Sequence, residues 1–239
     1  VGGDLTIVYR HQWMPENESR VWIDKLNSIE FNHGARSAGM RSLARTFGYL
    51  PRRTMRGDFC HVSQFDQTEP ETVDALKRVA GLAADAMLTA SPVLAHWQLA
   101  LLNEQVLSEY RMETDLPFTS GIINCDTSLM FHRDSGNFPG TWSAMLGLKR
   151  NIREGTGVLV IPELRTALEI GDGSLTMFDG KKWWHAVSPI RKARRDGKRY
   201  TVVFYAIQQL KNCLPWDEEM ARAVNIRTLR ERRREGLIE

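Results

Sequence analysis

His132 and Asp134 are the residues of this sequence whose types and spacing best suit metal chemistry. They are separated by Arg133 alone, in a short segment that predicts a β-strand. Residues i and i+2 of a strand point to the same face, so this imidazole and this carboxylate can bind one ion. His185 opens a later predicted strand. Two histidines and one carboxylate form the facial triad that holds non-haem Fe(II) and leaves positions open for a co-substrate and dioxygen.

Arg199 adds an anion site to this candidate triad. It lies 14 residues after His185 and opens a strongly apolar predicted strand. A buried guanidinium is costly unless it meets an anion, and its planar fork binds carboxylates with two hydrogen bonds. The distal carboxylate of 2-oxoglutarate fits this requirement. Thr201, on the same face of the strand, can add a hydroxyl to the same carboxylate.

Each of these residues also has a simpler interpretation. His132 and Asp134 could be a hydrogen-bonded surface pair. His185 could be a core residue, and Arg199 could belong to the basic hairpin beside it. The combination, in this order and inside a predicted barrel, favours iron. A zinc hydrolase or deaminase is disfavoured, because the sequence offers neither cysteine ligands nor a H-E-x-x-H helix.

The elements that must position these residues begin near Pro117. From there to Ala206, runs of β-branched and aromatic residues alternate with Gly, Asp and Asn turns. This pattern predicts short strands. The expected strands lie near 119–124, 128–133, 142–148, 157–161, 166–170, 174–178, 184–188 and 200–207. Eight such strands indicate a jelly roll or a barrel, and the expected core is a double-stranded β-helix (jelly roll).

The first half of the chain is predicted to be mainly helical. Apolar residues recur at helical spacing over 16–29, again after Pro70, and again after Pro92. A last helix is expected from Trp216 to about Arg233. We therefore expect an α+β fold in a single dioxygenase domain, 1–239. It comprises a helical N-terminal region (residues 1–116), the jelly-roll core (residues 117–208) and the C-terminal helix (residues 209–239).

The charge distribution suggests a polyanionic partner. Net charge is only +3 over 239 residues. The segment 34–57, however, contains no acidic residue. It has six arginines: Arg36, Arg41, Arg45, Arg52, Arg53 and Arg56. Such clusters bind nucleic acid through counterion release. Arg52 and Arg53 are the candidate phosphate contacts. A second basic cluster lies in 191–198. For the basic residues of the C-terminal helix, the blander interpretation of a solvated face is favoured.

The cysteine content and the hydropathy of the sequence indicate the cellular compartment of the protein. Cys60, Cys125 and Cys213 are sparse, odd in number and far apart, so we expect reduced thiols. The sequence contains no apolar run of the roughly 20 residues that span a bilayer, and it begins without a secretory signal. These features predict a cytoplasmic protein without a membrane partner, and no obligatory protein partner is evident.

Five motifs occur together in the second half of the chain: Pro117–Ile122, Phe131–Asn137, Gly157–Glu163, Gly173–Gly180 and Arg199–Tyr205. As a set they resemble the TET/JBP family, which oxidises the 5-methyl group of cytosine or thymine in nucleic acid with Fe(II), 2-oxoglutarate and O2. The resemblance covers roughly Thr46 to Ala206. The compact length and the Arg45–Arg52 segment look most like phage and bacterial members, which implies a phage-encoded protein in a bacterial host cell.

The resemblance implies roles for individual residues. His132, Asp134 and His185 match the iron ligands, and Arg199 matches the arginine that binds 2-oxoglutarate, with Thr201 where a hydroxyl is usual. Asn137 matches an asparagine that contacts the flipped base. Tyr205 matches an aromatic position near the base, and Trp184 is a candidate stacking platform. The implied activity is oxidation of 5-methylcytosine in DNA to 5-hydroxymethylcytosine, with further oxidation left open.

One position departs from the methylcytosine enzymes of animals. They carry a base-contacting histidine two residues beyond the tyrosine, whereas this chain has Ile207. Gln208 could replace the contact, although its side chain should face the other way on a regular strand. Three alternatives therefore stay open: a thymine-hydroxylating DNA dioxygenase, a hydroxylase of the same mechanism acting on a small molecule or protein side chain, and an inactive DNA-binding barrel.

Overall fold

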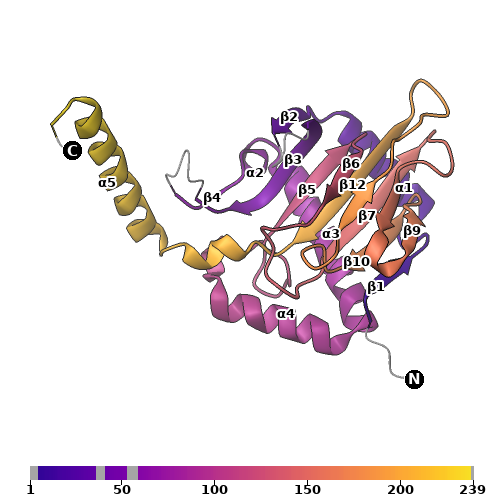
Figure 1. Cartoon of the computed structure of the whole chain (residues 1–239), viewed down its shortest axis with the longest axis horizontal. Helices are drawn as coiled ribbons and strands as arrows, with labels where there is room; N and C mark the ends of the chain where they lie inside the picture. Colours follow the sequence, from indigo (N-terminus) through magenta and orange to yellow (C-terminus); the bar gives the residue numbers. More distant parts are fainter. Residues whose placement is uncertain (1–4, 36–40, 53–58, 238–239) are drawn as a thin grey trace.

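Two antiparallel sheets form the centre of this computed structural model, which describes residues 5–35, 41–52 and 59–237 (Figure 1). The larger sheet has eight strands among the described residues, in the order β1-β10-β7-β12-β5-β3-β2, with β4 paired to β3. Their bounds are β1 Ile7–Arg10, β2 Asn32–Ala35, β3 Arg41–Leu50, β4 His61–Val62, β5 Ser120–Cys125, β7 Ser143–Arg150, β10 Ser174–Phe178 and β12 Lys198–Tyr205.

The smaller sheet has the order β6-β11-β8-β9. Its strands are β6 Leu129–His132, β8 Val158–Ile161, β9 Thr166–Glu169 and β11 His185–Val187. The two sheets contribute side chains to one shared cavity, as the sheets of a jelly roll do. The jelly-roll prediction is confirmed, and each of the eight strands expected between 117 and 208 is present.

Strand β12 shows how alternation separates core from cavity. Tyr200, Val202 and Phe204 are fully buried in the main apolar cluster. Arg199, Thr201, Val203 and Tyr205 instead line the cavity between the sheets. Successive side chains of a strand point to opposite faces, so one strand both secures the core and supplies polar groups to the site.

Helices cover the outer face of the larger sheet. α3 contributes Val73, Leu76, Ala80 and Ala83 at helical spacing to the apolar cluster that also holds β12. The helices are α1 Glu16–Asn27, α2 Gln64–Thr68, α3 Pro70–Ala90, α4 Pro92–Gln105 and α5 Trp216–Arg234. The helices expected near 16–29, after Pro70, after Pro92 and from Trp216 are therefore present.

Residues 1–116 contain the expected helices and also four strands that the sequence did not predict, β1 to β4. β3 pairs with β5 from Leu43–Cys125 to Gly48–Ser120 and so extends the larger sheet. The ring of Phe47 lies over Gly121, where a Cβ atom would stand 2.1 Å from it. The partner strand of β3 is about 80 residues away in sequence, so local periodicity gave little sign of this pairing.

Two of the three cysteines also differ from expectation. Cys60 and Cys213 form a disulfide across 153 residues of sequence, whereas Cys125 is a buried thiol. Burial and the nearby Asp126 carboxylate raise the pKa of the Cys125 thiol. The expectation of reduced thiols is wrong for the pair, since cysteines so far apart in sequence gave no local signal of pairing.

The C-terminal helix α5 extends away from the rest of the chain (Figure 1). Only Glu219 and Ala223 of this helix are buried. Its first turn is fixed next to Cys60, because buried Glu219 accepts a hydrogen bond from the backbone N of Cys60 at 3.0 Å. Among the described residues, no helix has the length and apolar character needed to cross a bilayer.

Candidate active site

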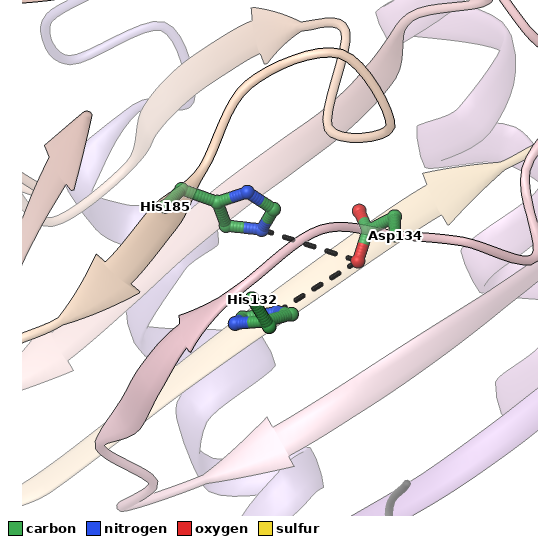
Figure 2. A group of neighbouring side chains, drawn as sticks. All are labelled: His132, Asp134 and His185. Atoms are coloured by element: carbon green, nitrogen blue, oxygen red, sulfur yellow. Dashed lines mark ion pairs between the residues drawn. The ribbon is translucent and has the colours of Figure 1, made fainter. Parts of the chain in front are cut away.

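His132, Asp134 and His185 converge on one point between the two sheets, and Figure 2 shows both imidazoles turned toward the Asp134 carboxylate. Nε2 of His132 lies 3.8 Å from Oδ1 of Asp134, and Nε2 of His185 lies 3.9 Å from the same oxygen. One ligand atom from each of the three residues lies within 4.8 Å of the others. A single ion at this point can bind all three.

Strand pairing creates this convergence. β6 and β11 are antiparallel neighbours, with His132 directly opposite His185. The register shifts between His185 and Val187, which marks an irregularity of the β-bulge kind. Bulges re-aim side chains near functional sites. The two imidazole rings consequently lie close together, with centroids 4.3 Å apart.

The hydrogen bonds of both histidines leave Nε2 facing the shared point. Nδ1 of His132 lies 2.8 Å from the carbonyl of Met130, and Nδ1 of His185 lies 3.0 Å from the carbonyl of Trp183. A carbonyl only accepts, so in each neutral ring the proton is assigned to Nδ1. The lone pair on Nε2 is then available for a metal, the arrangement in which backbone carbonyls orient metal-binding histidines.

A cavity of about 310 Å³ opens from the three residues. This volume lies near the lower end of the roughly 300–1,000 Å³ typical of small-molecule sites. Its apolar walls are Ile122, Leu129, Met145, Leu159, Phe178, Val187 and Val203. The rings of Phe178 and His185 meet edge to face, with centroids 5.2 Å apart and planes at 85°. The Phe178 ring thus packs against His185 and helps to hold it in place.

As the sequence predicted, Arg199 lies in the same cavity as His132, Asp134 and His185. Only 3% of its surface is exposed. Its Nη2 donates to the carbonyl of Gly157 at 3.1 Å, and no carboxylate of the described residues forms an ion pair with its guanidinium. Burial lowers the pKa of Arg199 to about 10, against a smaller opposing effect of Asp126. A buried cation with spare donors suits an anionic ligand such as a carboxylate.

Thr201 also faces the cavity, and its neighbour Asn124 is a residue that sequence reasoning missed. Nδ2 of Asn124 donates to Oγ1 of Thr201 at 3.1 Å. The threonine hydroxyl thereby accepts one bond and keeps its own proton for an acceptor in the cavity. The signal that could have identified Asn124 was its polarity within the otherwise apolar predicted strand 119–124. Asn124 and Ile122 both line the cavity, on the inward face of that strand.

The predicted base-contacting residues Asn137 and Tyr205 line the cavity as well. Nδ2 of buried Asn137 donates to Oγ of Ser143 at 3.1 Å, which fixes the amide. The hydroxyl of Tyr205 reaches the carbonyl of Gly121 at 3.4 Å. Ile207 packs against a separate apolar cluster that contains Leu102 and Phe138.

Trp184 lies beside the cavity rather than in its lining. Its side chain is 45% exposed, and the Arg133 guanidinium stands 5.2 Å from the centre of its ring. Glu163 bridges the two residues, because it pairs with Arg133 at 3.5 Å and accepts from the backbone N of Trp184 at 3.2 Å. The stacking role of Trp184 stays a prediction.

The structure gives Arg52 a partner that the sequence did not suggest. Its guanidinium pairs with Glu219 of α5, a carboxylate with no exposed surface. Its Nε and Nη2 bind the buried carboxylate, so this ion pair is a second role for Arg52, whose part as a phosphate contact stays a prediction. Arg53, the other predicted phosphate contact, lies outside the described residues, so its role stays a prediction.

Comparison with protein-family models and with curated proteins finds no match. Solved structures do match. NgTET1, in complex with 5mC DNA, aligns with a TM-score of 0.67 at 16% identity, covering 87% of this chain and 74% of its own. The chain shares the fold of NgTET1.

Two further structures align more weakly. An oxidoreductase of the 2OG-Fe(II) oxygenase family from Burkholderia pseudomallei aligns with a TM-score of 0.49 at 17% identity, covering 84% of this chain and 85% of its own. A viral collagen prolyl hydroxylase from Paramecium Bursaria Chlorella virus-1, in a 2OG complex, aligns with a TM-score of 0.46 at 14% identity, covering 85% and 97%. The likeness to NgTET1 concerns the fold, and the chemistry of this chain must be argued from its own residues.

Proposed function

We propose that the chain is an Fe(II)- and 2-oxoglutarate-dependent dioxygenase of the TET/JBP type, and that it oxidises 5-methylcytosine in DNA to 5-hydroxymethylcytosine. The observation that carries the proposal is the placement of two histidine Nε2 atoms and one carboxylate oxygen in the same cavity as buried Arg199. Two histidines and one carboxylate suit Fe(II), and the arginine suits a co-substrate carboxylate.

The donor set fits the proposed metal and co-substrate. His132, Asp134 and His185 would hold iron, while Arg199 and the Thr201 hydroxyl would bind the distal carboxylate of 2-oxoglutarate. When bound, these groups supply the oxidising chemistry: with O2, a methyl C–H becomes a C–OH while 2-oxoglutarate becomes succinate and CO2.

The DNA substrate is supported by sequence resemblance and by the shared fold of NgTET1, whose structure contains 5mC DNA. The resemblance also favours the phage and bacterial members of the family. In a stacked duplex the 5-methyl group lies at the major-groove edge, so a buried site requires a flipped base. Asn137 and Tyr205, in the lining of the cavity, are the proposed contacts to that base.

Thymine is the second candidate base. Position 207 carries an isoleucine that packs in an apolar cluster, so it offers no polar contact to the exocyclic amine that distinguishes cytosine. Cytosine carries an exocyclic amine there that donates a hydrogen bond, whereas thymine carries a carbonyl oxygen that accepts one. The amide of Asn137 can serve either, because it has both a carbonyl oxygen and an NH2 group.

Mass spectrometry of nucleosides tests the proposal. Protein, Fe(II), 2-oxoglutarate and ascorbate are incubated with a duplex containing 5-methylcytosine and, separately, with a thymine-only duplex. We expect 5-hydroxymethylcytosine and an equivalent amount of succinate from the first duplex. 5-Hydroxymethyluracil from the second would select the thymine candidate. Succinate without either product would point to another substrate.

An inactive variant supplies the control. Asp134→Ala removes the carboxylate ligand and should abolish succinate and product, while DNA affinity changes little because phosphate contacts dominate it. Turnover by this variant would contradict the ligand assignment. Wild-type protein that binds DNA but yields neither succinate nor product would instead support an inactive DNA-binding barrel.

A further inference from the structure

The side chain of Asp179 fixes the backbone of the turn between β10 and β11. Asp179 is buried, and its Oδ1 accepts from the backbone N of Lys181 at 3.0 Å and of Lys182 at 2.9 Å. Aspartates that bind the backbone two residues ahead fix turns in this way. Both lysines consequently start from a fixed backbone, yet their side chains have different surroundings.

The ammonium of Lys181 has three acceptors. It donates to the carbonyl of Ser135 at 2.9 Å, to the carbonyl of Asn137 at 2.5 Å and to Oε1 of Gln208 at 3.1 Å. An ammonium carries three N–H bonds, so all of them are used. Lys182, by contrast, is exposed and stands 4.6 Å from the centre of the Trp183 ring.

These bonds join three segments of the chain that meet at the cavity. Ser135, Gly136 and Asn137 form the loop after ligand Asp134 and line the cavity. Gln208 belongs to the segment after β12, and its backbone N donates to the carbonyl of Gly136 at 2.9 Å. Lys181 therefore ties this loop both to the β10–β11 turn and to the end of β12.

The hydrogen bond from Lys181 also explains where the side chain of Gln208 points. Its side-chain oxygen accepts from Lys181, and Gln208 is absent from the lining of the cavity. It is thus engaged in holding the loop rather than in presenting its amide to a base. Gln208 lies beyond the end of β12, in the 3-10 helix Gln208–Asn212, so the Lys181 contact rather than strand alternation accounts for its orientation.

We infer that Lys181 is a positioning residue that sets the Ser135–Asn137 loop as the wall against which the substrate base is placed. The inference rests on the proposed function. Asp134 has its own anchor, since its backbone N donates to the carbonyl of Gly180 at 2.9 Å. Loss of the Lys181 side chain should therefore disturb Asn137 and the substrate more than the iron ligands.

Lys181→Met tests the inference, with Lys182→Met as the matched control from the same turn. Methionine keeps most of the apolar stem and removes the ammonium. For Lys181→Met we expect the kcat for base oxidation to fall by roughly tenfold or more, because hydrogen bonds to a charged group are worth about 1.5–3 kcal/mol. The amount of succinate formed per oxidised base should rise several-fold. Lys182→Met should match the wild type in both values.

Iron and co-substrate binding separate positioning from general damage. The Fe(II)–2-oxoglutarate absorption of Lys181→Met, recorded without oxygen, should match that of the wild type. Gln208→Met should show a weaker form of the same defect, and the double variant should be no worse than Lys181→Met alone, because Gln208 acts through Lys181. Loss of this absorption in Lys181→Met would overturn the inference. A double variant whose defect equals the sum of the two single-variant defects would also overturn it.

Hydrogen exchange gives a readout that needs no activity. The amide of Phe138 donates to the carbonyl of Ala206 at 3.0 Å and reports on the loop. Peptides covering 134–138 should exchange faster in Lys181→Met than in Lys182→Met, with the β10 and β12 peptides unchanged. Equal exchange in the two variants would refute the positioning role even if the proposed reaction fails. Absence of succinate and product from the wild type would count against the proposed function alone.

Discussion

Gly180 and Asp134 are in direct contact at the edge of the cavity. The backbone N of Asp134 donates to the carbonyl of Gly180 at 2.9 Å. A Cβ atom at position 180 would stand 2.3 Å from Oδ2 and 3.1 Å from Cγ of Asp134. Only glycine therefore lets this backbone support the carboxylate ligand without moving it.

Gly180→Ala should weaken iron binding by about 10- to 100-fold, the usual effect of disturbing groups that orient metal ligands. The methyl group forces the Asp134 carboxylate away from the two Nε2 atoms. Gly136→Ala is the control, because a Cβ atom there meets nothing within 4 Å. Anaerobic titration with Fe(II) measures both variants, and equal affinities would argue against Asp134 as a ligand.

Arg199→Met should raise the KM for 2-oxoglutarate by about a hundredfold or more, because the carboxylate loses two charge-assisted hydrogen bonds. The ligand-free protein should be as stable as the wild type or more stable, since the variant removes a buried cation that lacks a carboxylate partner. Turnover against co-substrate concentration and urea unfolding measure the two effects. An unchanged KM would exclude Arg199 from the co-substrate site.

The pH dependence of stability follows from the same arginine. Its pKa is about 10 in the folded chain and 12.5 ordinarily. The unfolded chain therefore binds more protons between these values, and this effect makes folding more favourable as pH rises through that window. Below about pH 10 the buried charge costs roughly 3 kcal/mol. The stability difference between Arg199→Met and the wild type should shrink above pH 10, as unfolding at several pH values would reveal.

Arg52→Gln should lower the free energy of unfolding by on the order of 3 kcal/mol, because it leaves the buried Glu219 carboxylate without its cation. The salt dependence of DNA binding should stay as in the wild type, since Arg52 is occupied by Glu219. The exposed Arg195→Gln is the control for the loss of one positive charge. A smaller salt slope for Arg52→Gln alone would instead show that Arg52 also contacts phosphate.

Acid should weaken this same pair. Burial by itself would raise the pKa of Glu219, but the hydrogen bonds from Arg52, Leu214 N and Cys60 N lower it to about 2. The ordinary value is 4.5, so the stabilisation is complete above about pH 4.5 and is lost as the pH falls toward 2. Arg52→Gln should flatten this acid dependence in unfolding curves. An acid profile identical to the wild type would contradict the pairing.

Reduction of the Cys60–Cys213 disulfide should destabilise the chain by about 2–5 kcal/mol, because the link closes a long loop in the unfolded state. A Cys60→Ser/Cys213→Ser variant should match the reduced wild type and should not respond to reductant. Urea unfolding with and without dithiothreitol makes the comparison. A wild type indifferent to reductant would show that the bond does not contribute.

Local patterns of the sequence were enough for the strands between 117 and 208 and for two pairs of residues, His132 with Asp134 and Arg199 with Thr201. The one-residue spacing of His132 and Asp134 places both on one strand face, and the same alternation puts Arg199 beside Thr201. Runs of β-branched and aromatic residues, separated by Gly, Asp and Asn turns, predicted the short strands of the jelly roll. These inferences needed only relations within a few residues.

The tertiary structure decided every relation between distant segments. The partners of Arg52 and Cys60 lie 167 and 153 residues away, so no local pattern could name them. The contribution of β3 to the larger sheet depended on a free edge of β5. The difference between Lys181 and Lys182 likewise arises from which acceptors the fold brings near each ammonium. Sequence spacing thus determined which groups face the cavity, whereas only folding brought together the segments that support them.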